Sequence, residues 1–261
     1  TPLGTFSDLA QQIIPHMSEG TILTDTGSVK QSVIDAIVPL LKDREDIAFI
    51  PAHPIAGTEE SGVDAGFAEL FQKKKIIFTP LKEEDSKSNG YKALSAFWEK
   101  LGAQTELMDV AHHDQVFAVV SHIPHLIAYN IVGTAANLEQ VSEQEVIKYS
   151  ASGFRDFTRL ASSDPIIWRD VFIHNKEAVL DMLGRFVEDL FDLQRAIRYG
   201  DTESLEQRFE YSRTIRKQII DAGQDSPVVN FARNIERNIE HHLEDKLENK
   251  KKCALLWKLY F

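Results

Sequence analysis

The sequence has little of what marks several classes of protein. It contains a single cysteine, Cys253, so an intrachain disulfide and a cluster of thiolate metal ligands are both excluded. No uninterrupted apolar run approaches the roughly 18–20 residues of a membrane span. No signal peptide opens the chain. These absences predict a cytoplasmic protein with no membrane partner.

Familiar nucleotide and metal motifs are missing as well. The dinucleotide fingerprint GxGxxG occurs nowhere, and the P-loop-like glycine pair Gly57 and Gly62 is followed by Val63-Asp64 instead of Lys-Ser/Thr. Neither HExxH nor a cysteine pair is present, so no metal site is expected. The net charge of −11 argues against a nucleic-acid partner, because phosphates require a basic face. An anionic substrate would need locally clustered Arg, His or helix N-termini.

The apolar pattern changes near Met108. Before it, short apolar runs alternate with helical stretches, which is typical of βαβ units. After it, long helical periodicity predominates. The pattern predicts an α/β domain over 1–108 and a helical domain over 109–261. Expected strands are 21–25, 47–51, 75–79 and 104–108, and expected helices are 28–41, 91–101, 109–137, 172–199, 204–220 and 228–249. Asp164-Pro165 is a predicted helix start, and Gly200 a predicted helix end.

Two motifs follow predicted strands. Pro54 disfavours the α conformation at His53, so His53 continues a strand direction at the rim of the sheet, where ligands bind in open α/β folds. A loop histidine without a task is the competing interpretation. In Thr24–Lys30, Gly27 permits a tight turn, and Ser28 or Thr26 is expected to cap the next helix. Capping alone would explain the serine.

Two further motifs lie in the helical half. In Ser121-His-Ile-Pro-His125, His122 and His125 are three residues apart and share a helical face, while Pro124 should kink the helix. In the segment 153–159, Arg155 and Arg159 are four apart, and arginine grips carboxylates bidentately. Surface ion pairing with nearby aspartates is the plainer interpretation of the arginines alone.

The order of four motifs is more specific than any one of them. TDTGSVK, HPIAGTEESG, SHIPH and GFRDFTRLASSDPIIWRD together resemble the prephenate/arogenate (cyclohexadienyl) dehydrogenase family, over about residues 1–223. The resemblance implies a Rossmann-type NAD(P)-binding domain, followed by an all-α domain that forms a homodimer. It implies oxidative decarboxylation of prephenate to 4-hydroxyphenylpyruvate, of arogenate to tyrosine, or of both, with NAD or NADP as cofactor.

The resemblance also assigns roles to residues. His53 would be the hydrogen-bond acceptor or base, and Ser28 would orient it and touch the nicotinamide. Arg159 would bind a substrate carboxylate, and four residues would complete the substrate site: His125, Ser121, His122 and Thr58. A network that gates entry would comprise Glu59, Asp156 and Trp168. Cofactor contacts would come from Thr1, Pro2, Asp25 and Ser28. We expect His53, Ser28, His125 and Arg159 to converge on one cleft that excludes water.

One departure from the family pattern is large. The first two βαβ units, at least roughly 60 residues at about 30 each, are absent together with their glycine loop. The Rossmann-type domain is therefore expected to be truncated, and a polypeptide that begins at Thr1 to bind cofactor weakly and to lack turnover. The competing hypotheses are an inactive fragment whose helical domain still dimerises and, less favoured, a dehydrogenase of hydroxy acids. The choice between prephenate and arogenate stays open.

Overall fold

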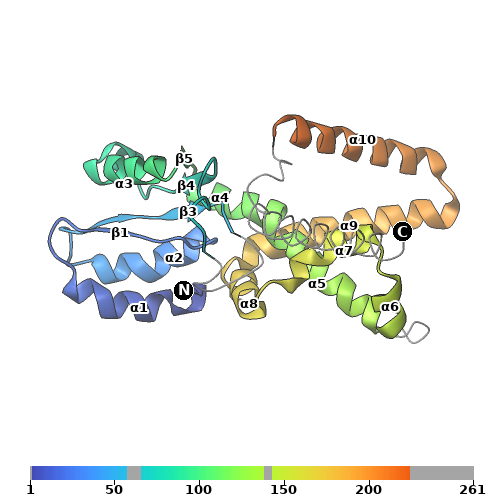
Figure 1. The fold of residues 1–261 in the computed structure, drawn as a ribbon, viewed down its shortest axis with the longest axis horizontal. Coiled ribbons are helices and arrows are strands. Elements are labelled where there is room, and N and C mark those ends of the chain that lie inside the picture. The colour runs from blue at the N-terminus through green and yellow to red at the C-terminus, as the bar shows by residue number, and fades with distance from the viewer. Residues whose placement is uncertain (1, 58–65, 138–142, 224–261) are drawn as a thin grey trace, which may run out of the picture. The chain divides into compact units, whose positions relative to one another are not determined.

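A computed structural model describes residues 2–57, 66–137 and 143–223, with its strands and first three helices in the N-terminal half (Figure 1). The strands are β1 (Ile22–Thr24), β2 (Ala48–Ile50), β3 (Ala52–Pro54), β4 (Lys75–Phe78) and β5 (Gln104–Leu107). The helices among them are α1 (Phe6–Ile13), α2 (Lys30–Ile37) and α3 (Asn89–Lys100). The four strands and two helices expected here are confirmed to within about two residues, apart from a 3₁₀ extension of α2 over Val38–Leu41.

The strand β3 was not expected, and its cause is a proline. β1 pairs with β2 in parallel, with Leu23 opposite Phe49. Pro51 then interrupts the ladder because it has no N–H to donate. The chain continues as β3, which pairs antiparallel with β4, and β4 pairs in parallel with β5. One nearly continuous segment thus links a two-stranded sheet to a three-stranded sheet.

Helices cover both sides of these strands. In Figure 1, α1 and α2 lie on one side of β1 and α3 lies on the other. A buried cluster of α1, α2 and β1–β2 side chains centres on Val29, Val33 and Ile14, and a second cluster beneath α3 centres on Ile76, Phe78 and Trp98. The strands that end at the sheet rim near His53 are therefore packed against apolar side chains on both sides.

The helical part begins at Val110 and, within the described residues up to 202, continues through further helices. They are α4 (Val110–Phe117), α5 (Ile123–Ala136), α6 (Glu143–Tyr149), α7 (Ser152–Thr158), α8 (Pro165–His174) and α9 (Lys176–Tyr199). A π-helical turn, Ala118–His122, joins α4 to α5. It ends two residues before Pro124, which cannot donate a backbone hydrogen bond, so the expected distortion takes the form of a π turn.

Helix ends follow the predicted chemistry, with one correction. Asp164 caps α8 by accepting a hydrogen bond from the Ile166 N–H at 2.7 Å, and Gly200 ends α9 in the left-handed region at φ 66°. The helix expected over 172–199 is interrupted, because α8 ends at His174 and α9 begins at Lys176. Asn175 between them turns its side chain to buried partners in α4 and the π turn.

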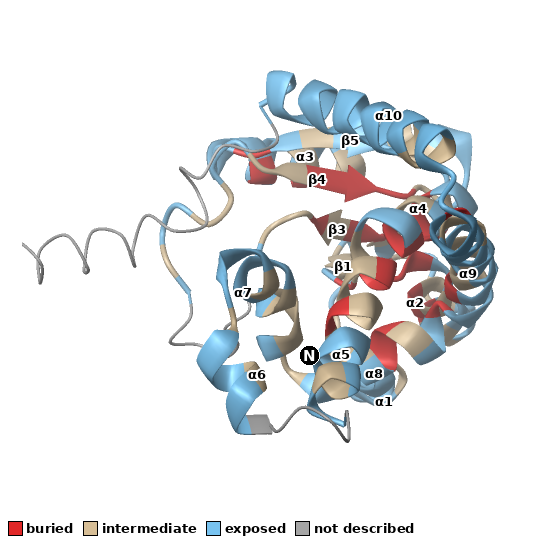
Figure 2. Ribbon diagram, turned by 90° about the vertical axis from the view of Figure 1, so that its right-hand side faces the viewer, coloured by how far each residue is buried: buried red, intermediate tan, exposed pale blue. Residues whose placement is uncertain are grey.

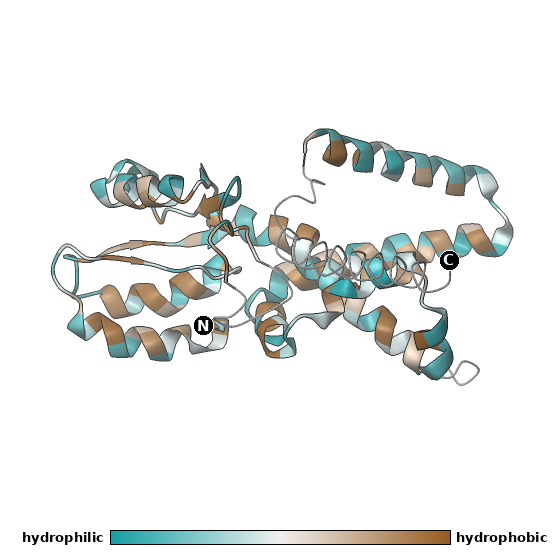
Figure 3. Cartoon of the chain, in the orientation of Figure 1, coloured by the Kyte–Doolittle hydropathy of each residue, from teal (hydrophilic) through white to brown (hydrophobic). Residues whose placement is uncertain are grey.

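Much of α9 is exposed (Figure 2), although apolar residues recur along it (Figure 3). Leu180, Phe191 and Ile197 are each more than half exposed. The continuous helix Val110–Ala136 is long and apolar enough to cross a membrane by length and composition alone. One such helix is weak evidence for a membrane span; 28% of its apolar window is buried, and the helix packs against α2 and α9.

Contacts assign the described residues to two units, one that extends to Thr202 and one that begins at Glu203. The helix α10 (Thr202–Asp221) lies in the second unit except for its first residue. It confirms the helix expected over 204–220. The helix expected over 228–249 lies outside the described residues. The change from α/β to all-helical structure falls between β5 and α4, and the domain boundary at 108 stays a prediction.

Candidate active site

A buried ion pair closes the turn between β1 and α2. The Lys30 ammonium is fully buried, pairs with the Asp25 carboxylate and donates to the Ala52 carbonyl at 2.6 Å. Asp25 also accepts from the backbone N–H groups of Gly27 at 2.8 Å and Ala52 at 3.1 Å. Burial lowers the pKa of Lys30, against the opposing effect of Asp25. The pair ties the turn after β1 to the strand that carries His53.

Asp114 of α4 caps α2 from a distance in sequence. Its two carboxylate oxygens accept the backbone N–H groups of Lys30 at 2.8 Å and Gln31 at 2.9 Å. Neither Ser28 nor Thr26 caps this helix, so that expectation was wrong: Val29 occupies the N-cap position and no side chain there makes a cap bond. A carboxylate at a helix N-terminus is also stabilised by the helix dipole.

His53 lies next to a second histidine. Its Nδ1 is 2.9 Å from Nε2 of His113 on α4, and Nδ1 of His113 is 2.8 Å from Oδ1 of Asp114. Phe117 packs edge-on against His53 with ring centroids 4.6 Å apart. Burial lowers the pKa of His53 well below its ordinary value, and the neighbouring His113 and Lys30 lower it further. His53 is therefore neutral at pH 7.

The π turn places His122 inside the protein. Its ring is fully buried, its Nδ1 lies 3.1 Å from Nδ2 of Asn175, and that amide also donates to the Asp114 carbonyl at 2.9 Å. Burial lowers the pKa of His122 to about 4. Its Nε2 has no hydrogen-bond partner in the part of the chain that the structure describes. Asn175 thus links His122, a further neutral imidazole, to Asp114 of the His53–His113–Asp114 group.

His125 and Arg159 form the other end of the site. The His125 ring stacks on Trp168 of α8 with centroids 3.5 Å apart, and its Nδ1–H donates to the Ser121 carbonyl at 2.8 Å. Burial lowers the pKa of His125, and the positive charge of Arg159 contributes to the shift. Arg159 lies on an exposed 3₁₀ turn, Arg159–Ser162. A cation beside a stacked imidazole suits a flat anionic ligand.

The structure brings together most, but not all, of the residues that the sequence singled out. Ring contacts and electrostatic interactions link five of these residues in series. Their order is His53, His122, Trp168, His125 and Arg159. Ser121 contributes its backbone carbonyl. Ser28 is half-buried in the turn after β1, and no hydrogen bond of the described residues joins it to His53. The common cleft of His53, Ser28, His125 and Arg159 stays a prediction.

The remaining predicted residues are placed less closely. Asp156 is exposed on α7, and Pro2 is the extended residue before a 3₁₀ turn, Leu3–Thr5. From Pro2 onward the described chain runs directly into this 3₁₀ turn. Thr1, Thr58 and Glu59 lie outside the described residues. The gating network of Glu59, Asp156 and Trp168 therefore stays a prediction.

Four buried polar residues were missed as members of the site: Lys30, His113, Asp114 and Asn175. The sequence did carry a signal for two of them: the polar pair His113-Asp114 lies in the helical pattern one turn before the apolar Phe117. Paired polar residues on the side of a helix that faces the core need partners. The spacing did not say which partners they would have.

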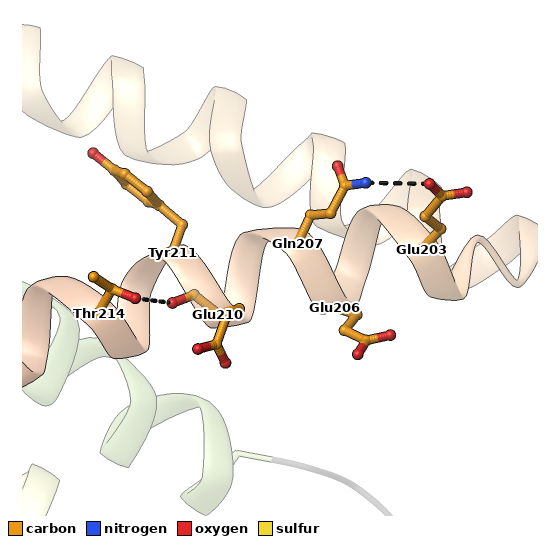
Figure 4. Close-up of a pocket in the computed structure, with 6 residues that line it drawn as sticks. All are labelled: Glu203, Glu206, Gln207, Glu210, Tyr211 and Thr214. Atoms are coloured by element: carbon orange, nitrogen blue, oxygen red, sulfur yellow. Dashed lines mark hydrogen bonds between the residues drawn. The ribbon is translucent and has the colours of Figure 1, made fainter.

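Two hollows elsewhere in the described chain are lined by other residues than those of this site. One on α10 is lined by Glu203, Glu206 and Glu210 with neighbouring polar groups (Figure 4), a set that would repel an anion. Another lies beyond the carboxyl ends of β4 and β5 and is lined by Lys82, Glu83 and Asp109 among others. Among the described residues, no group of three His, Cys, Asp or Glu could hold a metal ion.

Family models identify the chain. Residues 1–107 match the model of the prephenate dehydrogenase nucleotide-binding domain, and residues 109–211 match that of the prephenate dehydrogenase dimerization domain. The chain belongs to the prephenate dehydrogenase family. This is a family of oxidoreductases, and its fold is a Rossmann-type nucleotide-binding domain followed by a helical dimerization domain.

Relatives of the prephenate dehydrogenase family support the assignment over most of the chain. A cyclohexadienyl dehydrogenase of Zymomonas mobilis is 39% identical over 82% of this chain, which spans 72% of that protein. A prephenate dehydrogenase of Bacillus subtilis is 35% identical over 80% of this chain, which spans about half (53%) of it. The structure of Aquifex aeolicus prephenate dehydrogenase with hydroxyphenyl propionate and NAD+ is 37% identical, with a TM-score of 0.75, and the match covers 84% of this chain and 74% of that one.

A nicotinamide dinucleotide, NAD or NADP, is the cofactor that the nucleotide-binding model and the Aquifex structure indicate. The turn after β1 fits the nicotinamide end, which carries no phosphate. The N-terminus of α2 is closed by Asp114 and Lys30 is paired with Asp25, so neither offers positive charge to a phosphate. The Asp25 carboxylate is engaged within the protein, and its role as a cofactor contact stays a prediction. Ser28 at this turn suits a nicotinamide ring.

Proposed function

We propose that the chain carries the active site of an NAD(P)-dependent dehydrogenase that oxidatively decarboxylates prephenate, arogenate or both, in tyrosine biosynthesis. The observation that carries the proposal is His53, an imidazole held neutral by burial beside the turn that suits the nicotinamide. The relatives named cyclohexadienyl and prephenate dehydrogenase support it.

The chemistry requires an acceptor for the ring hydroxyl. The nicotinamide supplies a hydride acceptor when bound. As the hydride leaves the carbon that bears the hydroxyl, His53 accepts the hydroxyl hydrogen bond and stabilises the developing carbonyl character. The ring carboxylate then departs as carbon dioxide, its bonding electrons enter the ring, and the aromatic phenol forms. A neutral imidazole suits this role, because a protonated one has no lone pair to accept with.

The substrate carries carboxylates that must be held. Arg159 provides a cation next to His125 and Trp168, and a guanidinium binds a carboxylate through two parallel hydrogen bonds. The stacked pair of His125 and Trp168 gives the ring of the substrate a flat apolar wall. Selection between prephenate and arogenate depends on the side chain, which is a pyruvyl group in one and an amino-acid group in the other.

The dimerization model and the exposed apolar side chains of α9 support a homodimer. We propose a cytoplasmic homodimer without a nucleic-acid or membrane partner. Leu180, Phe191 and Ile197 provide apolar surface of the kind that a helical interface buries.

The test is nicotinamide reduction followed by absorbance with NAD and NADP and with each substrate. Turnover with at least one substrate would support the proposal against the expectation that a polypeptide beginning at Thr1 is inactive. In an active protein, we expect His53→Asn to lower kcat by about 100-fold or more, the usual range for loss of a general base. Arg159→Gln should chiefly raise KM. The acid limb of kcat/KM should lie well below pH 6.5, because the pKa of His53 is depressed. Full activity in His53→Asn would refute the mechanism. A dimer with no turnover would favour the inactive-fragment hypothesis.

A further inference from the structure

Three side chains from two elements form a single line of hydrogen bonds that ends at His53. We propose that Asp114 and His113 are positioning residues that fix the tautomer of His53, so that its Nε2 is the hydrogen-bond acceptor. The inference rests on the proposed function of His53 and adds two residues to its machinery. His53 lies on β3, while His113 and Asp114 lie on α4.

The direction of the line follows from Asp114. Both of its oxygens accept backbone N–H groups of α2, from Lys30 at 2.8 Å and from Gln31 at 2.9 Å. Burial opposes its ionisation, yet the hydrogen bonds from His113 and these amides keep the pKa of Asp114 below its ordinary value. Asp114 is therefore a carboxylate and can only accept.

The remaining assignments follow one from another. Since Asp114 accepts, Nδ1 of His113 must carry the proton that it donates over 2.8 Å. His113 is neutral, because burial lowers its pKa, so its Nε2 is an acceptor. Nδ1 of His53, 2.9 Å away, must then be the donor. The unprotonated nitrogen of His53 is Nε2, which is the acceptor that the proposed reaction needs.

The surroundings favour a fixed geometry. His113 is fully buried, and Phe117 packs against both imidazoles, with centroids 4.6 Å from His53 and 4.5 Å from His113. The Asp114 carbonyl is held by Asn175 at 2.9 Å. Because these contacts hold the two rings, the protonation pattern set at Asp114 is transmitted to His53. A plain helix cap would need none of the contacts beyond α2.

The first test reads the tautomers directly and does not depend on turnover. Long-range ¹H–¹⁵N spectra of the full chain labelled with ¹⁵N-histidine would be recorded at pH 7.5, and His53→Asn and His113→Asn would assign the signals. We expect His53 and His113 both to be protonated at Nδ1. His53 protonated at Nε2 would overturn the inference, whatever the enzyme's activity. Absence of turnover in the parent would instead count against the proposed function alone.

The second test uses a matched pair at position 113. The Gln side chain can present an oxygen near the place of Nε2, whereas the Asn side chain reaches only the place of Nδ1; both leave Asp114 and its cap on α2 intact. His113→Gln should keep kcat within about tenfold of the parent, and His113→Asn should lose about 100-fold, with KM for the cofactor unchanged. Equal losses in both variants, in step with their thermal stability, would show a merely structural role and overturn the inference.

Asp114→Asn gives the strongest expected effect. With its NH₂ at the place of Oδ1, the amide would reverse every donor and acceptor along the line and leave His53 protonated at Nε2; with its NH₂ at the place of Oδ2, it would face the Gln31 N–H and leave the line intact. The same replacement in a serine-protease triad keeps the geometry and lowers kcat about 10⁴-fold through the wrong tautomer. We expect at least about a 100-fold loss of kcat together with a tautomer change in the ¹⁵N spectrum. A loss of kcat of that size with an unchanged His53 signal would overturn the inference.

Discussion

Acid should destabilise this protein, because burial makes several histidines harder to protonate in the folded state than in the unfolded chain. The contribution of His122 to the free energy of unfolding can be calculated. Its ring is fully buried, and burial lowers its pKa from 6.5 to about 4. The unfolded chain takes up a proton as the pH falls through 6.5, but the folded chain does not until about pH 4. Stability from this group is complete above 6.5 and is lost between those values.

The magnitude follows from linkage. One pKa unit corresponds to about 1.36 kcal/mol, so a shift from 6.5 to about 4 removes about 3 kcal/mol from the free energy of unfolding at pH 4. Native domains are stable by only about 5–15 kcal/mol, so the loss is large. His53, His113 and His125 have lowered pKa values as well and act in the same direction.

The assay is urea unfolding at several pH values between 4 and 7, for the parent and for His122→Asn. The Asn side chain offers an oxygen to Asn175 in place of Nδ1 but cannot ionise. We expect the variant to lose less stability on acidification, by up to about 3 kcal/mol at pH 4. A parallel NMR titration should place the midpoint of His122 near 4. Equal pH dependence in the two proteins, or a midpoint near 6.5, would refute the reasoning.

Two further predictions concern stability. Lys30→Met should lower the free energy of unfolding by about 3–5 kcal/mol, since it leaves the nearly buried Asp25 carboxylate without its cation. Lys42→Met, at an exposed site, is the control in the same denaturant titration. Equal losses of stability in the two variants would contradict the prediction. Gly200→Ala should cost about 1 kcal/mol, because the residue lies at φ 66°, whereas Gly184→Ala inside α9 should stabilise by up to about 1 kcal/mol. Thermal unfolding would show shifts of opposite sign, and shifts of the same sign would be inconsistent with this account.

The elements of the fold could be predicted from the sequence because local patterns encode them. Four strands and most helices appear where the apolar periodicity places them, and Asp164-Pro165 and Gly200 mark helix ends by local chemistry. The family could also be inferred, since four motifs in a fixed order are specific. His53 was recognised because the following proline and the preceding apolar run place it at a sheet rim.

The partners of these residues could not be predicted, because they come from elsewhere in the chain. Asp114 caps a helix that begins 84 residues earlier, and Asn175 reaches His122 across 53 residues. A serine near the start of α2 looked sufficient as a cap, but the tertiary fold brought a carboxylate to the same amides. A residue's own side chain and near neighbours determine helix, strand and turn. Burial, tautomer and pKa depend on which distant groups packing brings within hydrogen-bond distance, and only the folded chain decides that.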